Sequence, residues 1–140
     1  MLTLPRLVTL NAILAMALGI AFALYGPLML AFFGIADIPS QEALLYWNIA
    51  SFARLFGAGI FSLGLLLFAL RAPLANQELS TQSRRGVIFS LLLGNLLTTI
   101  VILTQQASVW SAATGWILSA VFGLLTLAYG FLMVGQREVD

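Results

Sequence analysis

Four long apolar segments constrain the fold of this sequence more than any other feature. They cover residues 7–25, 44–70, 87–104 and 115–134. A helix of about 18 or more apolar residues is long enough to cross the hydrocarbon core of a bilayer. We therefore predict an all-α protein, a four-transmembrane-helix bundle that forms a single integral membrane domain over residues 1–140.

The content of charged residues supports a membrane protein. Only 8% of the 140 residues are charged and 61% are hydrophobic, whereas about a quarter of the residues of a soluble domain are charged. The loops between the apolar segments are too short to form a separate soluble domain, so partners are expected to meet the protein within the membrane.

The positions of the basic residues predict the orientation. All six basic residues are arginines; Arg6 precedes the first segment, Arg71, Arg84 and Arg85 lie between the second and third, and Arg137 follows the fourth. Loops 34–42 and 105–114 contain none. By the positive-inside rule, both termini and the middle loop are cytoplasmic. Five aromatic residues then lie at the outer interface: Tyr25, Tyr46, Trp47, Trp110 and Trp116.

Residues 28–35 follow Gly26-Pro27 and are too short to cross a membrane. A proline cannot continue the hydrogen bonding of a regular helix. The sequence leaves two alternatives for this segment: a helical piece along the outer interface, or a continuation of the first helix beyond a proline kink.

Small residues spaced four apart in each apolar segment predict helix contacts, because close approach stabilises helix pairs in lipid. The predicted ladders are Ala15, Gly19 and Ala23; Ala53 and Gly57, with Ala58 and Ser62 beside them; Ser90, Gly94 and Thr98; and Gly115, Ser119 and Gly123. Together they predict a compact bundle. They do not distinguish contacts within the chain from contacts with a partner subunit.

Polar residues inside the apolar segments predict two layers of interhelical contacts. Counting ~1.5 Å per residue along each helix, the layer near the inner face contains Asn11, Ser90 and Tyr129. The layer near the midplane contains Asn95, Ser62 and Thr126. We interpret these residues as interhelical hydrogen-bonding groups; the alternative is a polar pathway.

Arg54 is a charge inside the second apolar segment. It lies about 24 Å above the inner boundary of a ~30 Å core, in the outer half, where its side chain can reach the headgroups. Three interpretations remain: pairing or snorkelling, with Asp37 as an acidic partner; contact with a phosphate or carboxylate ligand; or an interface with another protein. A site for a ligand or lipid headgroup would contain Arg54, Asn48, Tyr46, Tyr25 and Gln105.

The sequence lacks the residue types that most enzymes and cofactor sites need. It has no histidine and no cysteine, which excludes imidazole and thiolate ligands and thiol nucleophiles. All five acidic residues lie outside the apolar segments. We therefore predict no catalytic residue, no metal site and no cofactor. The chain also has no polybasic segment, which predicts no nucleic-acid partner.

The stretch "ARLFGAGIFSLGLLLFALR", residues 53–71, resembles a group of uncharacterised small four-helix bacterial membrane proteins whose second helix carries arginine followed by glycine and alanine. The resemblance implies architecture and no catalytic residue. We therefore expect a multi-pass protein of the bacterial cytoplasmic (inner) membrane. Its expected role is that of a non-enzymatic accessory or structural subunit of a larger membrane complex, for which a respiratory or photosynthetic complex is a natural setting. Its partners would be membrane lipids and other membrane-protein subunits. The alternative is a binder or carrier of a lipid or small anionic amphiphile at the Arg54 site.

Overall fold

The computed structural model describes residues 3–35, 43–76, 78–108 and 113–135. These residues form four helices: α1 (Leu4–Phe32), α2 (Ala43–Ala75), α3 (Thr81–Ser108) and α4 (Thr114–Gly135). All four are long and apolar enough to cross a membrane. The shortest, α4, has 22 residues and therefore extends over about 33 Å. The predicted all-α class with four span-length helices is confirmed.

Each helix extends beyond the apolar segment that predicted it. The largest difference at a helix start is in α3, which begins at Thr81 rather than at residue 87. The hydroxyl of Ser80 accepts a hydrogen bond from the backbone N–H of Ser83 at 3.1 Å, which caps this helix start. Hydropathy marks where apolar side chains begin, but backbone hydrogen bonds and caps decide where a helix begins.

Helix α1 is kinked at its proline. Tyr25 has non-helical backbone angles (φ −116°, ψ 35°), and helix resumes after it through Pro27 to Phe32. The proline ring removes a backbone donor and disturbs the preceding turn. Beyond the kink, Phe33 is buried and stacks on Phe22 with ring centroids 6.0 Å apart. Residues 28–32 therefore continue α1 and fold back onto it.

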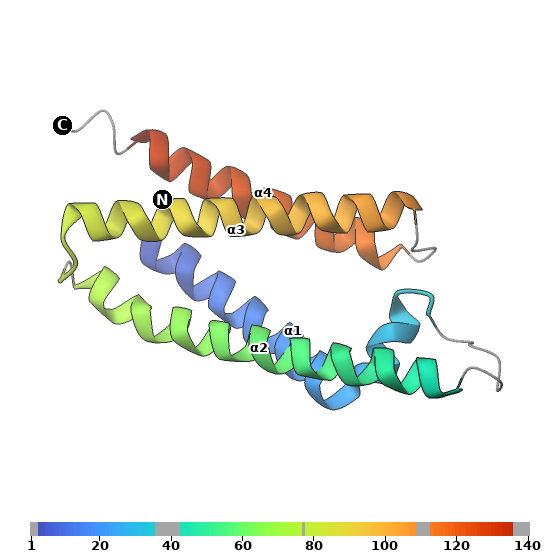
Figure 1. Cartoon of the computed structure of the whole chain (residues 1–140). Coiled ribbons are helices and arrows are strands. Elements are labelled where there is room, and N and C mark those ends of the chain that lie inside the picture. The colour runs from blue at the N-terminus through green and yellow to red at the C-terminus, as the bar shows by residue number, and fades with distance from the viewer. Residues whose placement is uncertain (1–2, 36–42, 77, 109–112, 136–140) are drawn as a thin grey trace.

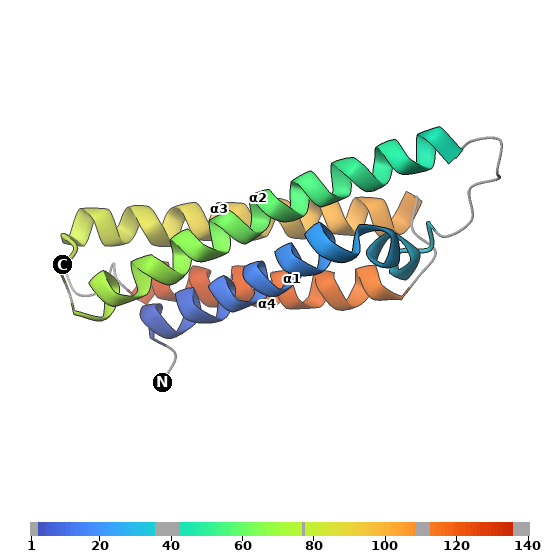
Figure 2. The same cartoon turned by 90° about the horizontal axis from the view of Figure 1, so that it is seen from below.

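The four helices form two antiparallel hairpins (Figures 1 and 2). Helix α1 packs along α2, α3 packs along α4, and the hairpins meet mainly where α1 contacts α4. Helix α1 begins, α2 ends, α3 begins and α4 ends at one end of the molecule (Figure 1). We call this the basic end, because Arg6, Arg71, Arg84 and Arg85 lie there. The opposite end, with Tyr46, Trp47 and Trp116, is the aromatic end.

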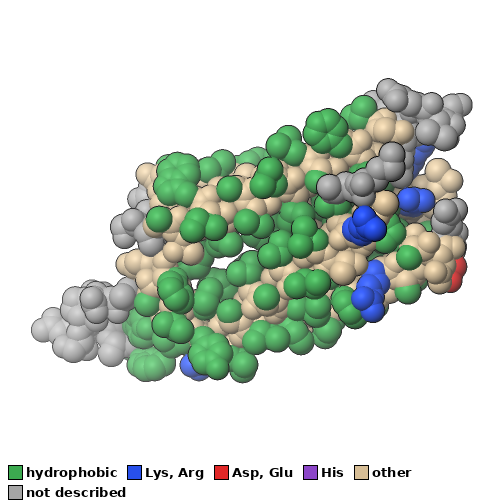
Figure 3. All heavy atoms as spheres, turned by 180° about the vertical axis from the view of Figure 1, so that it is seen from behind, with side chains coloured by type: hydrophobic (Ala, Val, Ile, Leu, Met, Phe, Trp, Pro, Cys, Tyr) green, Lys and Arg blue, Asp and Glu red, His purple; other side chains and the backbone are tan. Residues whose placement is uncertain are grey.

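The buried core joins the two hairpins near the basic end. Its members are Leu4, Leu7, Val8, Ala12, Leu67, Leu74, Ile88, Leu125 and Tyr129. At the aromatic end the hairpins are joined by a hydrogen bond from the Thr114 hydroxyl to the Phe32 carbonyl, at 2.7 Å. Figure 3 shows an opening between the hairpins away from the core. The hairpins are thus held together mainly at one end.

Candidate functional site

The described charges are strongly segregated. In Figure 3 the arginine side chains gather at the basic end, apart from one near the other end. Glu78 is the only carboxylate among the described residues, and it accepts a hydrogen bond from the Asn76 amide at 3.0 Å. Asp37, the acidic partner considered for Arg54, lies outside the described residues, as does Trp110 of the predicted aromatic belt.

Arg54 lies next to the kink of α1. Its side chain is exposed, and its stem crosses the backbone of Gly26. A Cβ atom on Gly26 would lie 3.0 Å from the Arg54 Cγ atom and 3.5 Å from its Nε atom. Gly26 therefore leaves the space that the arginine stem occupies. The sequence gives no signal for this role, because Gly26 stands out there only as the residue before Pro27.

The other residues assigned to the Arg54 site are spread over the aromatic end. Tyr25 precedes Gly26 and is exposed. Tyr46 packs edge-on against Trp47, with ring centroids 5.6 Å apart. Asn48 is exposed, and Gln105 is half-buried on α3, a helix that packs chiefly against α4. The structure thus places Tyr25 at the level of Arg54, but shows no polar contact between Arg54 and the other assigned residues.

In the predicted polar layer near the inner face, two of the three residues lie next to each other on different helices. Asn11 of α1 and Tyr129 of α4 are both buried, and their side chains lie next to each other. The Tyr129 hydroxyl forms no hydrogen bond of good geometry, so the two groups are neighbours without optimal alignment. Ser90, assigned to the same layer, is exposed on α3.

The midplane residues bond within their own helices. Asn95 is buried and donates to the Leu91 carbonyl at 2.7 Å. Thr126 donates to Phe122 at 2.9 Å. Ser62 donates to Ala58 at 3.0 Å and is exposed. The hydroxyls and the Asn95 amide therefore satisfy carbonyls of the preceding turn, which is a common arrangement for serine and threonine in membrane helices.

The glycines of the predicted ladders on α1 and α2 are used within the chain, whereas Ala58 and Ser62 beside them are exposed. A Cβ atom on Gly19 would lie 2.5 Å from the Phe61 nitrogen. One on Gly57 would lie 2.5 Å from the Ala23 nitrogen, and one on Gly64 would lie 2.8 Å from the Met16 nitrogen. Backbone meets backbone at these three positions, which only glycine allows. Gly64 was not part of the predicted ladder, although it lies seven residues after Gly57 and so on the same helix face.

The predicted ladder on α3 is only partly covered within the described chain: Thr98 is half-buried, but Ser90 and Gly94 are exposed. Gly86, which was not part of that ladder, lies four residues before Ser90 and is exposed as well. An added Cβ atom on Gly86 or Gly94 would meet nothing within 4 Å. We call Gly86, Ser90 and Gly94 the open face of α3. On α4, by contrast, Gly115 and Ser119 are buried.

No chemical centre stands out in the described part of the chain. Those residues contain no group of three or more His, Cys, Asp or Glu side chains that could hold a metal ion. An apolar groove of about 520 Å³ lies on the outer side of α2, lined by Phe52, Leu55, Phe56, Gly59, Ile60 and Leu63. It contains no group for acid–base chemistry.

No protein-family model matches this chain, and no curated protein and no solved structure shows detectable similarity to it. Functional assignments therefore rest on the geometry of the chain itself.

Proposed function

We propose that this protein is a non-enzymatic accessory or structural subunit of a larger membrane assembly, and that it binds a transmembrane helix of a partner protein on the open face of α3. We assign it to the bacterial cytoplasmic membrane because of the resemblance of residues 53–71 to small bacterial four-helix proteins. The basic end is proposed to face the cytoplasm, in line with the positive-inside rule.

The observation that carries this proposal is the open face of α3. Small residues four apart allow two helices to approach closely. Such close packing matters in a membrane, because the hydrophobic effect contributes little to helix association in lipid. The chain satisfies its α1–α2 ladder internally at Gly19 and Gly57. Gly86, Ser90 and Gly94 form the same kind of surface on α3, but no described helix of the chain covers it.

Substitution of Gly94 by leucine tests the proposal. Gly94→Leu adds a side chain into open space, so the protein itself should fold normally, while a partner helix would be pushed away. After mild detergent extraction from native membranes, the wild type should migrate in native electrophoresis as a complex with partner proteins, and Gly94→Leu should migrate alone.

The matched control is Gly59→Leu on α2, because an added Cβ atom on Gly59 also meets nothing within 4 Å. This control should keep the complex. Migration of the wild type by itself, or an intact complex in Gly94→Leu, would contradict the proposal.

The exposed guanidinium of Arg54 favours a second candidate, a binder of a lipid or anionic amphiphile at the aromatic end. Within the described residues Arg54 has no ion-pair partner, and its stem is held over Gly26. A carrier of this kind would purify alone with a bound lipid and would lose that lipid in Arg54→Ala. The same extraction therefore separates the two functions.

A further inference from the structure

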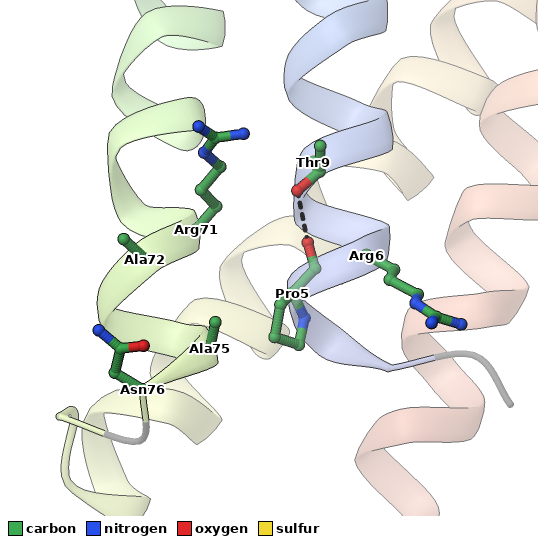
Figure 4. Close-up of a pocket in the computed structure, with 7 residues that line it drawn as sticks. All are labelled: Pro5, Arg6, Thr9, Arg71, Ala72, Ala75 and Asn76. Carbon is green, nitrogen blue, oxygen red and sulfur yellow. Dashed lines mark hydrogen bonds between the residues drawn. The ribbon is translucent and has the colours of Figure 1, made fainter.

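A groove lies between α1 and α2 at the basic end (Figure 4). Its volume is about 500 Å³, and it is lined by Pro5, Arg6, Thr9, Arg71, Ala72, Ala75 and Asn76. The groove exists because the two helices touch closely near Gly19 and Gly64 and diverge from there toward the basic end (Figure 1). Ala72 and Ala75 keep its α2 side low, since each side chain is a single methyl group.

Arg71 supplies the positive charge of the groove. Its guanidinium extends along the groove to the level of Thr9, whereas the guanidinium of Arg6 points away from it, toward the far side of α1 (Figure 4). The Arg71 Cζ atom lies 3.7 Å from the centre of the Phe68 ring. Stacking of this kind fixes the plane of a guanidinium and leaves its N–H edges able to donate.

The polar groups that line the groove suit an anion with a hydroxylated substituent. No carboxylate belongs to the lining of the groove. The Thr9 hydroxyl donates to the Pro5 carbonyl at 2.8 Å, so its oxygen remains able to accept. The Asn76 amide uses one of its N–H groups on Glu78 and retains its carbonyl oxygen and a second N–H.

The surface next to the groove is apolar and exposed. Ile13 and Ile20 lie on α1 about one and three turns beyond Thr9, and they are 50% and 43% exposed. A free inorganic anion gains nothing from such a surface, but acyl chains attached to a phosphate would cover it. Basic pockets between transmembrane helices are also a known recognition mode for anionic lipid headgroups.

We propose that this groove binds the phosphodiester of an anionic phospholipid from the leaflet at the basic end. Arg71 donates two hydrogen bonds to the phosphate, as the geometry of a guanidinium favours. Thr9, which lies level with the Arg71 guanidinium, contacts the polar substituent of the headgroup, and the acyl chains lie along Ile13 and Ile20. This site is on different helices from the open face of α3 and is independent of the proposed function.

Native mass spectrometry of the purified full-length protein with added lipid tests the proposal. The wild type should retain one phosphatidylglycerol at concentrations where phosphatidylcholine is not retained. Arg71→Gln should weaken this binding roughly tenfold, because a charge-assisted contact is lost. Ala75→Leu should weaken it as well, since leucine fills the groove without changing the charge.

Arg85→Gln is the matched control, because it removes an arginine at the same end that does not line the groove. It should bind phosphatidylglycerol like the wild type. Equal losses in Arg71→Gln and Arg85→Gln would show attraction to net charge alone and would overturn the site. Full binding in Ala75→Leu would also overturn it.

A control with inorganic phosphate distinguishes binding of a lipid phosphodiester from binding of a free phosphate ion. Added without lipid, it should give no retained adduct, since it cannot contact Ile13 and Ile20. An Arg71-dependent phosphate adduct as strong as that of phosphatidylglycerol would overturn the assignment to a lipid. The elution volume of each variant in size-exclusion chromatography verifies that it is folded.

Discussion

The two helical hairpins contain similar small residues but use them differently. In the α1–α2 hairpin, Gly19 and Gly57 bring the two backbones into direct contact. In the α3–α4 hairpin, the atoms nearest to an added Cβ on Gly123 and Gly130 are side-chain methyl groups of Thr99 and Leu92, both 3.9 Å away. At these glycines, side chains therefore separate α3 from α4, whereas backbones touch at Gly19 and Gly57 between α1 and α2.

This difference shows that the spacing of small residues does not by itself identify a contact. On α1, small residues four apart lie in a tight helix crossing. On α3, the same spacing at Gly86, Ser90 and Gly94 gives an uncovered surface. We interpret the α1–α2 hairpin as the rigid part of the molecule. In the proposed function, the α3–α4 hairpin with its open face is the part that binds a partner.

The largest effect is expected for Gly19→Leu. The new side chain would collide with the Phe61 backbone, because even a Cβ atom would lie 2.5 Å from its nitrogen. The α1–α2 crossing would have to open, which we expect to lower the free energy of unfolding by about 3 kcal/mol. Unfolding by sodium dodecyl sulfate in mixed micelles, followed by circular dichroism, measures this loss.

Gly59→Leu is the control for this measurement, since Gly59 lies on α2 but faces open space. It should unfold at the same detergent fraction as the wild type or at a slightly higher one, because leucine is a better helix former than glycine. A similar loss of stability in both variants would show that the crossing is not the sensitive contact.

A smaller effect is expected where the two hairpins meet through Asn11 and Tyr129. Both side chains are buried and adjacent, but the Tyr129 hydroxyl lacks a well-formed hydrogen bond. A double-mutant cycle of Asn11→Ala and Tyr129→Phe, measured by the same unfolding assay, should give a coupling near the average for membrane helices, about 0.6 kcal/mol. A coupling above about 1.5 kcal/mol would contradict the imperfect geometry.

The smallest effect is expected for Gly130→Ala in the α3–α4 hairpin. The nearest atom to the new methyl group, Leu92 Cδ1, is 3.9 Å away, which is an ordinary contact distance. Alanine is also the better helix former, so the free energy of unfolding should rise by up to about 0.5 kcal/mol. A clear loss of stability would show that α3 and α4 pack as closely as α1 and α2.

The candidate sites could be anticipated only in part. Arg54 is conspicuous in the sequence as a charge within an apolar segment, yet its contact with Gly26 depends on the kink at Tyr25. The groove around Arg71 was not predicted, because Thr9 and Arg71 are far apart in the sequence and meet only through the α1–α2 crossing. The sequence does contain one indication of this groove: Ala72 and Ala75 are two small residues on the turn after Arg71.

The sequence by itself determined the number of helices and their apolar character, because bilayer thickness translates directly into the length of an apolar segment. It also determined that no imidazole and no thiol side chain is available, since histidine and cysteine are missing from the chain. Only the tertiary structure decided which small residues meet a neighbour. Gly57 and Gly94 look alike in sequence, but a helix crossing is set by how whole surfaces fit together, and that fit covers Gly57 and leaves Gly94 open.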